Sequence, residues 1–245
     1  MPPEPSRFVT IDGCQLEYEW HGPAAGDAPT IVFLHEGLGA ITLWRDFPAS
    51  LCARLGWGGL VYNRRGYGHS GAVDAPFTPR FMHWEALEVL PRVLDRFEIT
   101  EPILFGHSDG GSIALLYAAS GLRPPRALIL EAPHVFVEDV TVASIRALRD
   151  QYRSTDLRAR LERHHGANVD TLFEAWTTIW LSDSFRDWHI TAALGGVGVV
   201  KFGREMKFGG VIPSGFSLQQ NAGPVALKAI KMFRPQKFRG FTRVF

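Results

Sequence analysis

One stretch, residues 103–119, constrains the fold of this chain more than any other. The apolar run Ile103–Phe105 predicts a buried strand, a short turn follows, and an apolar helical pattern begins directly after it. The turn carries Ser108 at its centre. Gly106 and Gly110 flank this serine, as expected for a turn from strand to helix so tight that only minimal side chains are tolerated. The alternative is an ordinary glycine turn. The strand–turn–helix context favours a serine exposed at a helix N-terminus.

The rest of the first half alternates strands with helices. Continuous apolar runs at 30–34, 59–62 and 126–130 are typical of strands covered on both faces of a parallel sheet. Residues 84–97 have apolar side chains at helical spacing, and an Asp-Gly turn within 8–20 predicts a hairpin. This alternation predicts an α/β fold with a mostly parallel central sheet.

The character changes between residues 137 and 190. Long helical patterns rich in arginine, glutamate and aromatic residues follow one another with no strand between them. A helical insertion after a sheet strand is expected to cover the strand ends and to close a pocket, with Trp176 and Trp180 among its lining. The alternative is that these helices only add packing.

Composition excludes several classes of function. The chain has 245 residues, 46% of them hydrophobic, and a net charge of +1, which gives no indication of nucleic-acid or membrane-surface binding. Its two cysteines, Cys14 and Cys52, have no metal-ligand spacing and imply no disulfide framework. No signal-peptide pattern and no apolar run near 20 residues is present, which favours a cytoplasmic protein.

Three motifs together resemble a known family. The serine turn, the loop His35-Glu36-Gly37 and the loop Asn63–Ser70 occur in the order found in the α/β-hydrolase fold family. The similarity is greatest to its serine members: esterases, carbon–carbon bond hydrolases and cofactor-free haloperoxidase-like enzymes. The resemblance implies a hydrolase core over 1–136, a helical cap over 137–190, and hydrolysis of a small organic ester, acyl or carbon–carbon bond with no metal or cofactor.

The resemblance also implies roles for individual residues. Ser108 would be the nucleophile, and the backbone N–H groups of Asp109 and Gly37 would form the oxyanion hole, with the Glu36 N–H as the alternative to that of Gly37. One such donor typically contributes about 3 kcal/mol of transition-state stabilisation. Glu36 departs from the family's usual His-Gly pattern, and its carboxylate either lies near the pocket mouth or points into solvent.

The other two members of a catalytic triad are missing where the family places them. In this fold the acid and then the histidine follow the serine, on loops after the last two strands. No histidine follows His189 and no aspartate follows Asp187. Glu131 and His134, directly after the run at 126–130, remain as possible surrogate partners for Ser108.

The composition of residues 191–245 also breaks with the rest. Residues 1–190 contain 17 arginines and no lysine, whereas 191–245 contain five lysines, four arginines and a single acid. We hypothesise that a frameshift or a fused segment replaced the end of the hydrolase, leaving its last core strands absent or irregular. A divergent basic tail is the alternative. Translation of the coding DNA in its other two frames decides between them. Activity would then be impaired, or the chain would be an inactive binding protein of the same fold.

Overall fold

A single sheet forms the centre of the molecule. The computed structural model describes residues 7–196, 200–202 and 227–231. Within these residues eight strands pair in the order β1-β2-β4-β3-β5-β6-β8-β7. Their bounds are β1 Arg7–Ile11, β2 Cys14–His21, β3 Thr30–Leu34, β4 Gly58–Tyr62, β5 Ile103–His107, β6 Ala127–Glu131, β7 Val200–Phe202 and β8 Leu227–Lys231. The hairpin β1–β2 and the pair β2–β4 are antiparallel, and all other pairs are parallel. The predicted fold class is confirmed.

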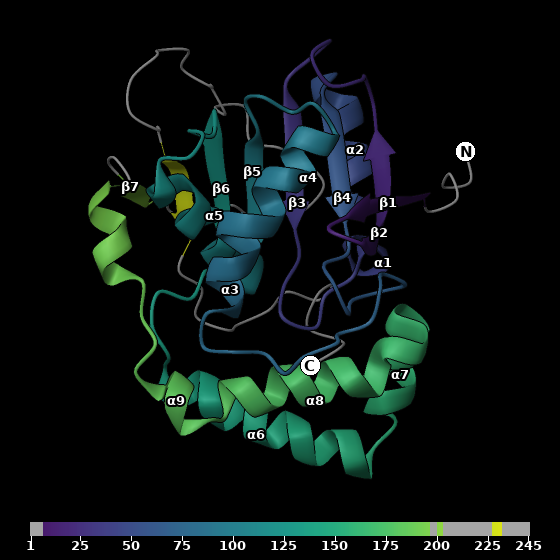
Figure 1. Ribbon diagram of the computed structural model, residues 1–245, viewed down its shortest axis with the longest axis vertical. Helices are drawn as coiled ribbons and strands as arrows, with labels where there is room; N and C mark the ends of the chain where they lie inside the picture. Colours follow the sequence, from purple (N-terminus) through teal and green to yellow (C-terminus); the bar gives the residue numbers. More distant parts are fainter. Residues whose placement is uncertain (1–6, 197–199, 203–226, 232–245) are drawn as a thin grey trace.

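Helices cover both faces of the sheet (Figure 1). One face carries α3 (Phe81–Trp84), the π-helical turn η1 (Glu85–Val89), α4 (Leu90–Arg96) and α5 (Asp109–Ser120); the other carries α1 (Ile41–Trp44) and α2 (Phe47–Leu55). Strands β3 and β4 are buried along their whole length. Alternate residues of β3 therefore enter different cores: Val32 packs with the α3–α5 side, and Phe33 with Trp44 and Phe105 on the α1–α2 side.

The C-terminal strands pair irregularly with the sheet. β8 pairs with Leu128–Glu131 of β6, and β7 with β8, each with a shift of register. Strand β8 has five residues, as β6 does, and β7 has three. The expectation of absent or irregular core strands is thus met by irregular ones. Loops that would carry a triad acid and histidine after these strands lie outside the described residues.

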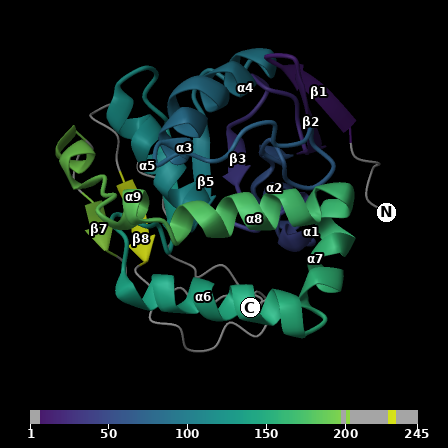
Figure 2. The ribbon, with the colours of Figure 1, turned by 60° about the horizontal axis from the view of Figure 1, so that its bottom comes forward.

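The segment after β6 is helical. It contains α6 (Asp139–Ser154), α7 (Leu157–His165), η2 (Gly166–Asn168), α8 (Val169–Trp180) and α9 (Asp183–Arg186). Figures 1 and 2 show these helices lying across the ends of the parallel strands, with α8 nearer the core than α6. The two ends of the insertion meet in an antiparallel bridge between Phe136 and His189, flanked by hydrogen bonds from Val137 N–H to Trp188 and from Ile190 N–H to Val135. The insertion therefore leaves the core and returns to it at one point.

Buried polar groups fasten this insertion to the core loops. His165 accepts a hydrogen bond from the Gly68 N–H at 3.0 Å, and its other ring nitrogen lies 3.1 Å from the Leu38 carbonyl. Asn168 donates to the Gly68 and Ser70 carbonyls. Burial lowers the pKa of His165 to about 4, so the neutral ring that these bonds require is the form present near neutral pH. No helix in the described ranges has the length and apolar character to cross a membrane.

Candidate active site

The turn between β5 and α5 holds Ser108 in a strained conformation. Its φ of 51° and ψ of −118° lie where side chains are rarely tolerated. The turn can be this sharp because a Cβ on Gly106 would come within 2.4 Å of the Gly110 carbonyl oxygen, and one on Gly110 within 2.0 Å of the Leu34 carbonyl oxygen. Glycine at both positions is a steric requirement. This conformation places the Ser108 hydroxyl at the N-terminus of a 12-residue helix, α5.

The structure brings Ser108 and His134 together. The Oγ of Ser108 lies 3.1 Å from Nε2 of His134, a hydrogen-bonding distance. His134 follows β6 by three residues, and its backbone is fixed by Ser112, whose hydroxyl accepts from the His134 N–H at 2.9 Å and donates to the His134 carbonyl at 2.7 Å. A candidate nucleophile and a candidate base are therefore in contact.

The surroundings of His134 favour the neutral imidazole that a general base must be. Burial lowers the pKa of His134, and the nearby charge of His107 acts in the same direction. The carboxylates of Asp109 and Glu138 oppose this but do not overcome it. The ring packs edge to face on Trp180 of α8 with centroids 4.8 Å apart. A neutral ring can accept the Ser108 proton at neutral pH.

The second surrogate, Glu131, is placed differently. Its backbone carbonyl accepts a hydrogen bond from the Ser108 N–H at 2.8 Å, so its main chain helps to hold the turn. Its charge raises the pKa of His107. The described contacts thus link Glu131 to His107 and to the Ser108 backbone.

The residues expected to supply the oxyanion donors border the cap. A Cβ on Gly37 would lie 2.4 Å from Nε1 of Trp176, so the indole of α8 lies directly against the Gly37 backbone. The same Nε1 donates to Oδ2 of Asp109 at 2.9 Å. Trp176 therefore spans the two segments that carry Gly37 and Asp109. Sequence reasoning identified this tryptophan only as part of the cap, because its partners are far away in the chain.

The two alternatives for Glu36 are distinguished by burial. Glu36 is 7% exposed, and its Oε2 lies 3.2 Å from Nδ1 of His107, so the side chain does not point into solvent. Burial alone would raise the pKa of Glu36, but the hydrogen bond and charge of His107 leave it below its ordinary value. Burial alone would lower the pKa of His107, and Glu36 reverses this. The result is an ion pair beside the serine turn.

A buried arginine shapes the loop that carries Gly37. Arg64 donates to the His35 carbonyl at 3.0 Å and to the Glu36 carbonyl at 2.9 Å. Its backbone N–H donates to Nε2 of His35 at 3.2 Å, and burial is the main reason that the pKa of His35 lies well below its ordinary value. His35 is thus a structural residue of the loop.

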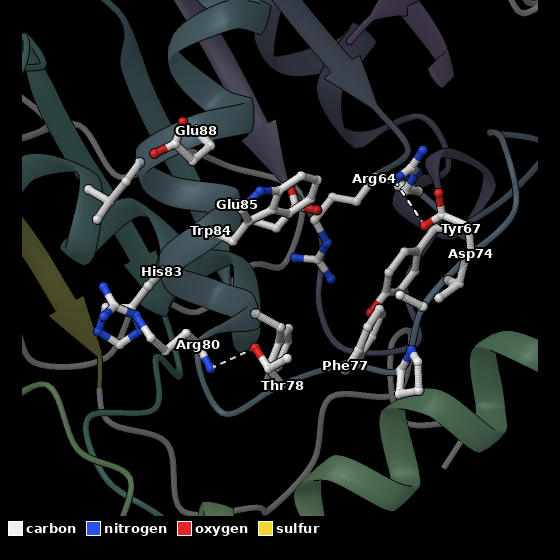
Figure 3. Close-up of a pocket in the computed structure, with 16 residues that line it drawn as sticks. Arg64, Tyr67, Asp74, Phe77, Thr78, Arg80, His83, Trp84, Glu85 and Glu88 are labelled. Carbon is white, nitrogen blue, oxygen red and sulfur yellow. Dashed lines mark hydrogen bonds and ion pairs between the residues drawn. The ribbon is translucent and has the colours of Figure 1, made fainter. Parts of the chain in front are cut away.

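A cavity of about 510 Å³ lies apart from the serine, between the loop after β4 and the start of α3. Figure 3 shows Trp84 and Glu85 on one side of it and Tyr67 and Asp74 on the other. Burial raises the pKa of Glu85 to about 7, against the opposing charges of Arg64 and Arg65. The lining includes neither Ser108 nor His134. Within the described ranges no group of three or more histidine, cysteine or acidic side chains is arranged to hold a metal ion.

Comparison with known proteins agrees with this geometry. The model of the α/β hydrolase fold family matches residues 29–179, which include the serine turn, His134 and most of the cap. The chain belongs to the α/β hydrolase fold family. No curated protein sequence matches the chain.

Solved hydrolases share the fold at low sequence identity. A carboxylesterase structure from Nitrososphaera gargenis is 19% identical with a TM-score of 0.56, covering 78% of this chain and 75% of the other. The esterase EaEST from Exiguobacterium antarcticum has the same identity and TM-score, with coverages of 78% and 77%. The enol-lactonase from Burkholderia xenovorans LB400 is 22% identical with a TM-score of 0.54 and covers 74% of each chain. At this identity the similarity to these structures shows the fold alone.

Proposed function

We propose that this hydrolase is serine-dependent and acts on a small organic ester or related acyl compound through a Ser108–His134 pair. The observation that carries the proposal is the 3.1 Å contact between Ser108 Oγ and His134 Nε2. The esterase and lactonase relatives support acyl transfer to water as the reaction class. His134 stands in for the histidine that the family places later in the chain.

The proposed steps use only groups of this chain and water. Ser108 Oγ attacks the acyl carbon while its proton passes to Nε2 of His134. The N–H groups of Gly37 and Asp109 stabilise the oxyanion. His134 then returns the proton to the leaving oxygen, and an acyl-enzyme remains. Water attacks this ester while His134 takes its proton. His134 then passes that proton to Ser108 Oγ as the bond between Oγ and the acyl carbon breaks, which restores Ser108 and releases the acid.

The proposed activity is impaired relative to a complete triad. A triad carboxylate fixes the histidine tautomer and stabilises the imidazolium, and its loss in a triad enzyme lowers kcat by about four orders of magnitude. Residues 191–245 contain no histidine or aspartate that could restore the family's arrangement. We therefore expect slow turnover and measurable acylation.

Covalent labelling tests the proposal without a known substrate. A fluorophosphonate probe should label the full-length chain at Ser108, and Ser108→Ala should abolish labelling. His134→Gln should slow labelling by about 100-fold or more, because a positioned general base typically contributes that much. His21→Gln is the matched control, since His21 lies on β2 and pairs with Glu19. Unchanged labelling in His134→Gln would refute the pair.

The alternative is an inactive binding protein that keeps the hydrolase pocket. The absence of the triad residues after 190 favours it. Such a protein would not react with the probe at Ser108, although a small acid or ester could still bind beneath the cap. Failure of labelling in the folded wild-type chain would therefore select this function over the hydrolase.

A further inference from the structure

Asp109 is a buried carboxylate that the proposed mechanism does not use. Asp109 is 0% exposed. The proposed mechanism uses only its backbone N–H, as an oxyanion donor, and gives its carboxylate no role. Oδ2 accepts the Trp176 hydrogen bond, and Oδ1 has no hydrogen-bond partner among the described residues. A carboxylate removed from water with one oxygen unsatisfied is costly unless nearby positive charge compensates for the lost hydration.

Charged side chains around Asp109 come from three segments, and the charge of Asp109 also helps to raise the pKa of Tyr67, on the same loop as Arg64. Arg64, on the loop after β4, is the buried cation whose pKa Asp109 helps to raise. His107 precedes the serine turn and is already paired with Glu36. His134 faces the turn from the loop after β6 and is also influenced by the exposed Glu138. Of the cations near Asp109, Arg64 and His107 hydrogen-bond elsewhere, and His134 is the ring that gains and loses a proton in each step.

We propose that the Asp109 side chain is the electrostatic partner of His134, a positioning residue that takes over the charge-stabilising part of the missing triad acid. Asp109 is adjacent in sequence to Ser108, which contacts His134, and its carboxylate is held at a fixed place in a water-excluded site. A buried negative charge there stabilises the imidazolium as it forms. This inference rests on the proposed function.

The cap takes part in this arrangement. Trp176 of α8 fixes the Asp109 carboxylate, and Trp180, one helical turn later, packs on the His134 ring. The two indoles lie 6.1 Å apart. One face of α8 therefore holds both members of the proposed charge pair, so that removing the Trp176 N–H should weaken the effect of Asp109.

Two measurements on the full-length chain test the inference. The His134 ring titration followed by NMR, assigned by the signal lost in His134→Gln, should shift to lower pH in Asp109→Asn, because the raising charge is gone. The plateau rate of fluorophosphonate labelling should fall about tenfold, the equivalent of about one pKa unit. Asn keeps an acceptor for Trp176, so thermal unfolding should change little. Trp176→Phe should shift the titration in the same direction by less.

Glu138→Gln is the matched control. Glu138 also influences His134 but is exposed, so its charge is screened and the shift should be smaller. An equal His134 titration in Asp109→Asn and wild type, or an equal shift in Glu138→Gln, would overturn the inference. The titration does not depend on catalysis. Absence of labelling in a wild type that shows the Asp109 shift would refute the hydrolase proposal and leave the charge pair standing.

Discussion

The hydroxyl of Ser112 bonds both sides of the His134 residue: it accepts from the His134 N–H at 2.9 Å and donates to the His134 carbonyl at 2.7 Å. Ser112 lies one helical turn after Ser108 on α5. The helix that begins at the proposed nucleophile therefore also fixes the backbone of its proposed partner. Ser112 holds the main chain of His134, and Trp180 of the cap packs on its ring.

Removal of that hydroxyl should separate the pair. In Ser112→Ala the buried N–H and carbonyl of His134 lose their partner, which should cost about 1–3 kcal/mol of unfolding free energy. Probe labelling at Ser108 should slow about tenfold or more, since a displaced base forfeits part of its contribution. Urea unfolding and labelling rates check both effects. Ser144→Ala is the control. The Ser144 hydroxyl, like that of Ser112, donates a hydrogen bond to a backbone carbonyl, but its acceptor is Val140 on an exposed face of α6.

The contact between Gly37 and Trp176 predicts a steric coupling. A Cβ at position 37 would lie within 2.4–2.5 Å of three indole atoms, so Gly37→Ala should displace α8 and cost about 1–3 kcal/mol. In a Trp176→Phe background, where the smaller ring leaves room, the same substitution should cost less. A double-mutant cycle in unfolding free energy measures this difference. Equal losses of unfolding free energy in both backgrounds would show that the clash with Trp176 is not what destabilises Gly37→Ala.

The attachment of the cap should weaken in acid. Burial lowers the pKa of His165 to about 4, below the ordinary value of 6.5. Between those values the unfolded chain binds a proton that the folded chain excludes, so the stability that His165 contributes is complete above about pH 6.5 and is lost as the pH falls toward 4. His165→Gln offers a donor and an acceptor without titrating. Unfolding free energies at pH 7 and pH 5 should differ less in this variant than in wild type.

The local parts of this structure could be predicted from sequence. The glycines around Ser108 predict the tight turn between β5 and α5, because the close backbone contacts of this turn are within a few residues or with the adjacent strand β3. The continuous apolar runs predict strands that are covered on both faces of the sheet. The fold follows from these signals. Residues 203–226 and 232–245 lie outside the described part, and the reading-frame hypothesis for residues 191–245 stays a prediction.

The choices that the sequence left open depend on long-range packing. Glu131 and His134 were both possible partners of Ser108. They differ because the chain turns at Ala132, with a φ of 46°, and because Ser112 then fixes His134. Glu36 was equally open, and its burial follows from His107, 71 residues away in the chain. No local pattern contains this information.

Glu17 supplies a last test, of the loop that carries Arg64. Its Oε2 accepts from Asn63 Nδ2 at 2.6 Å and from the His69 N–H at 2.8 Å, and the carboxylate is 4% exposed. Glu17→Ala leaves one buried donor, Asn63 Nδ2, and one part-buried donor, the His69 N–H, without an acceptor, and should cost about 2–4 kcal/mol in urea unfolding. Glu19→Ala, on the same strand but only paired with His21 near the surface, should cost less than about 1 kcal/mol. Similar losses in the two variants would mean that β2 tolerates neither truncation and that the bonds to the loop are not what matters.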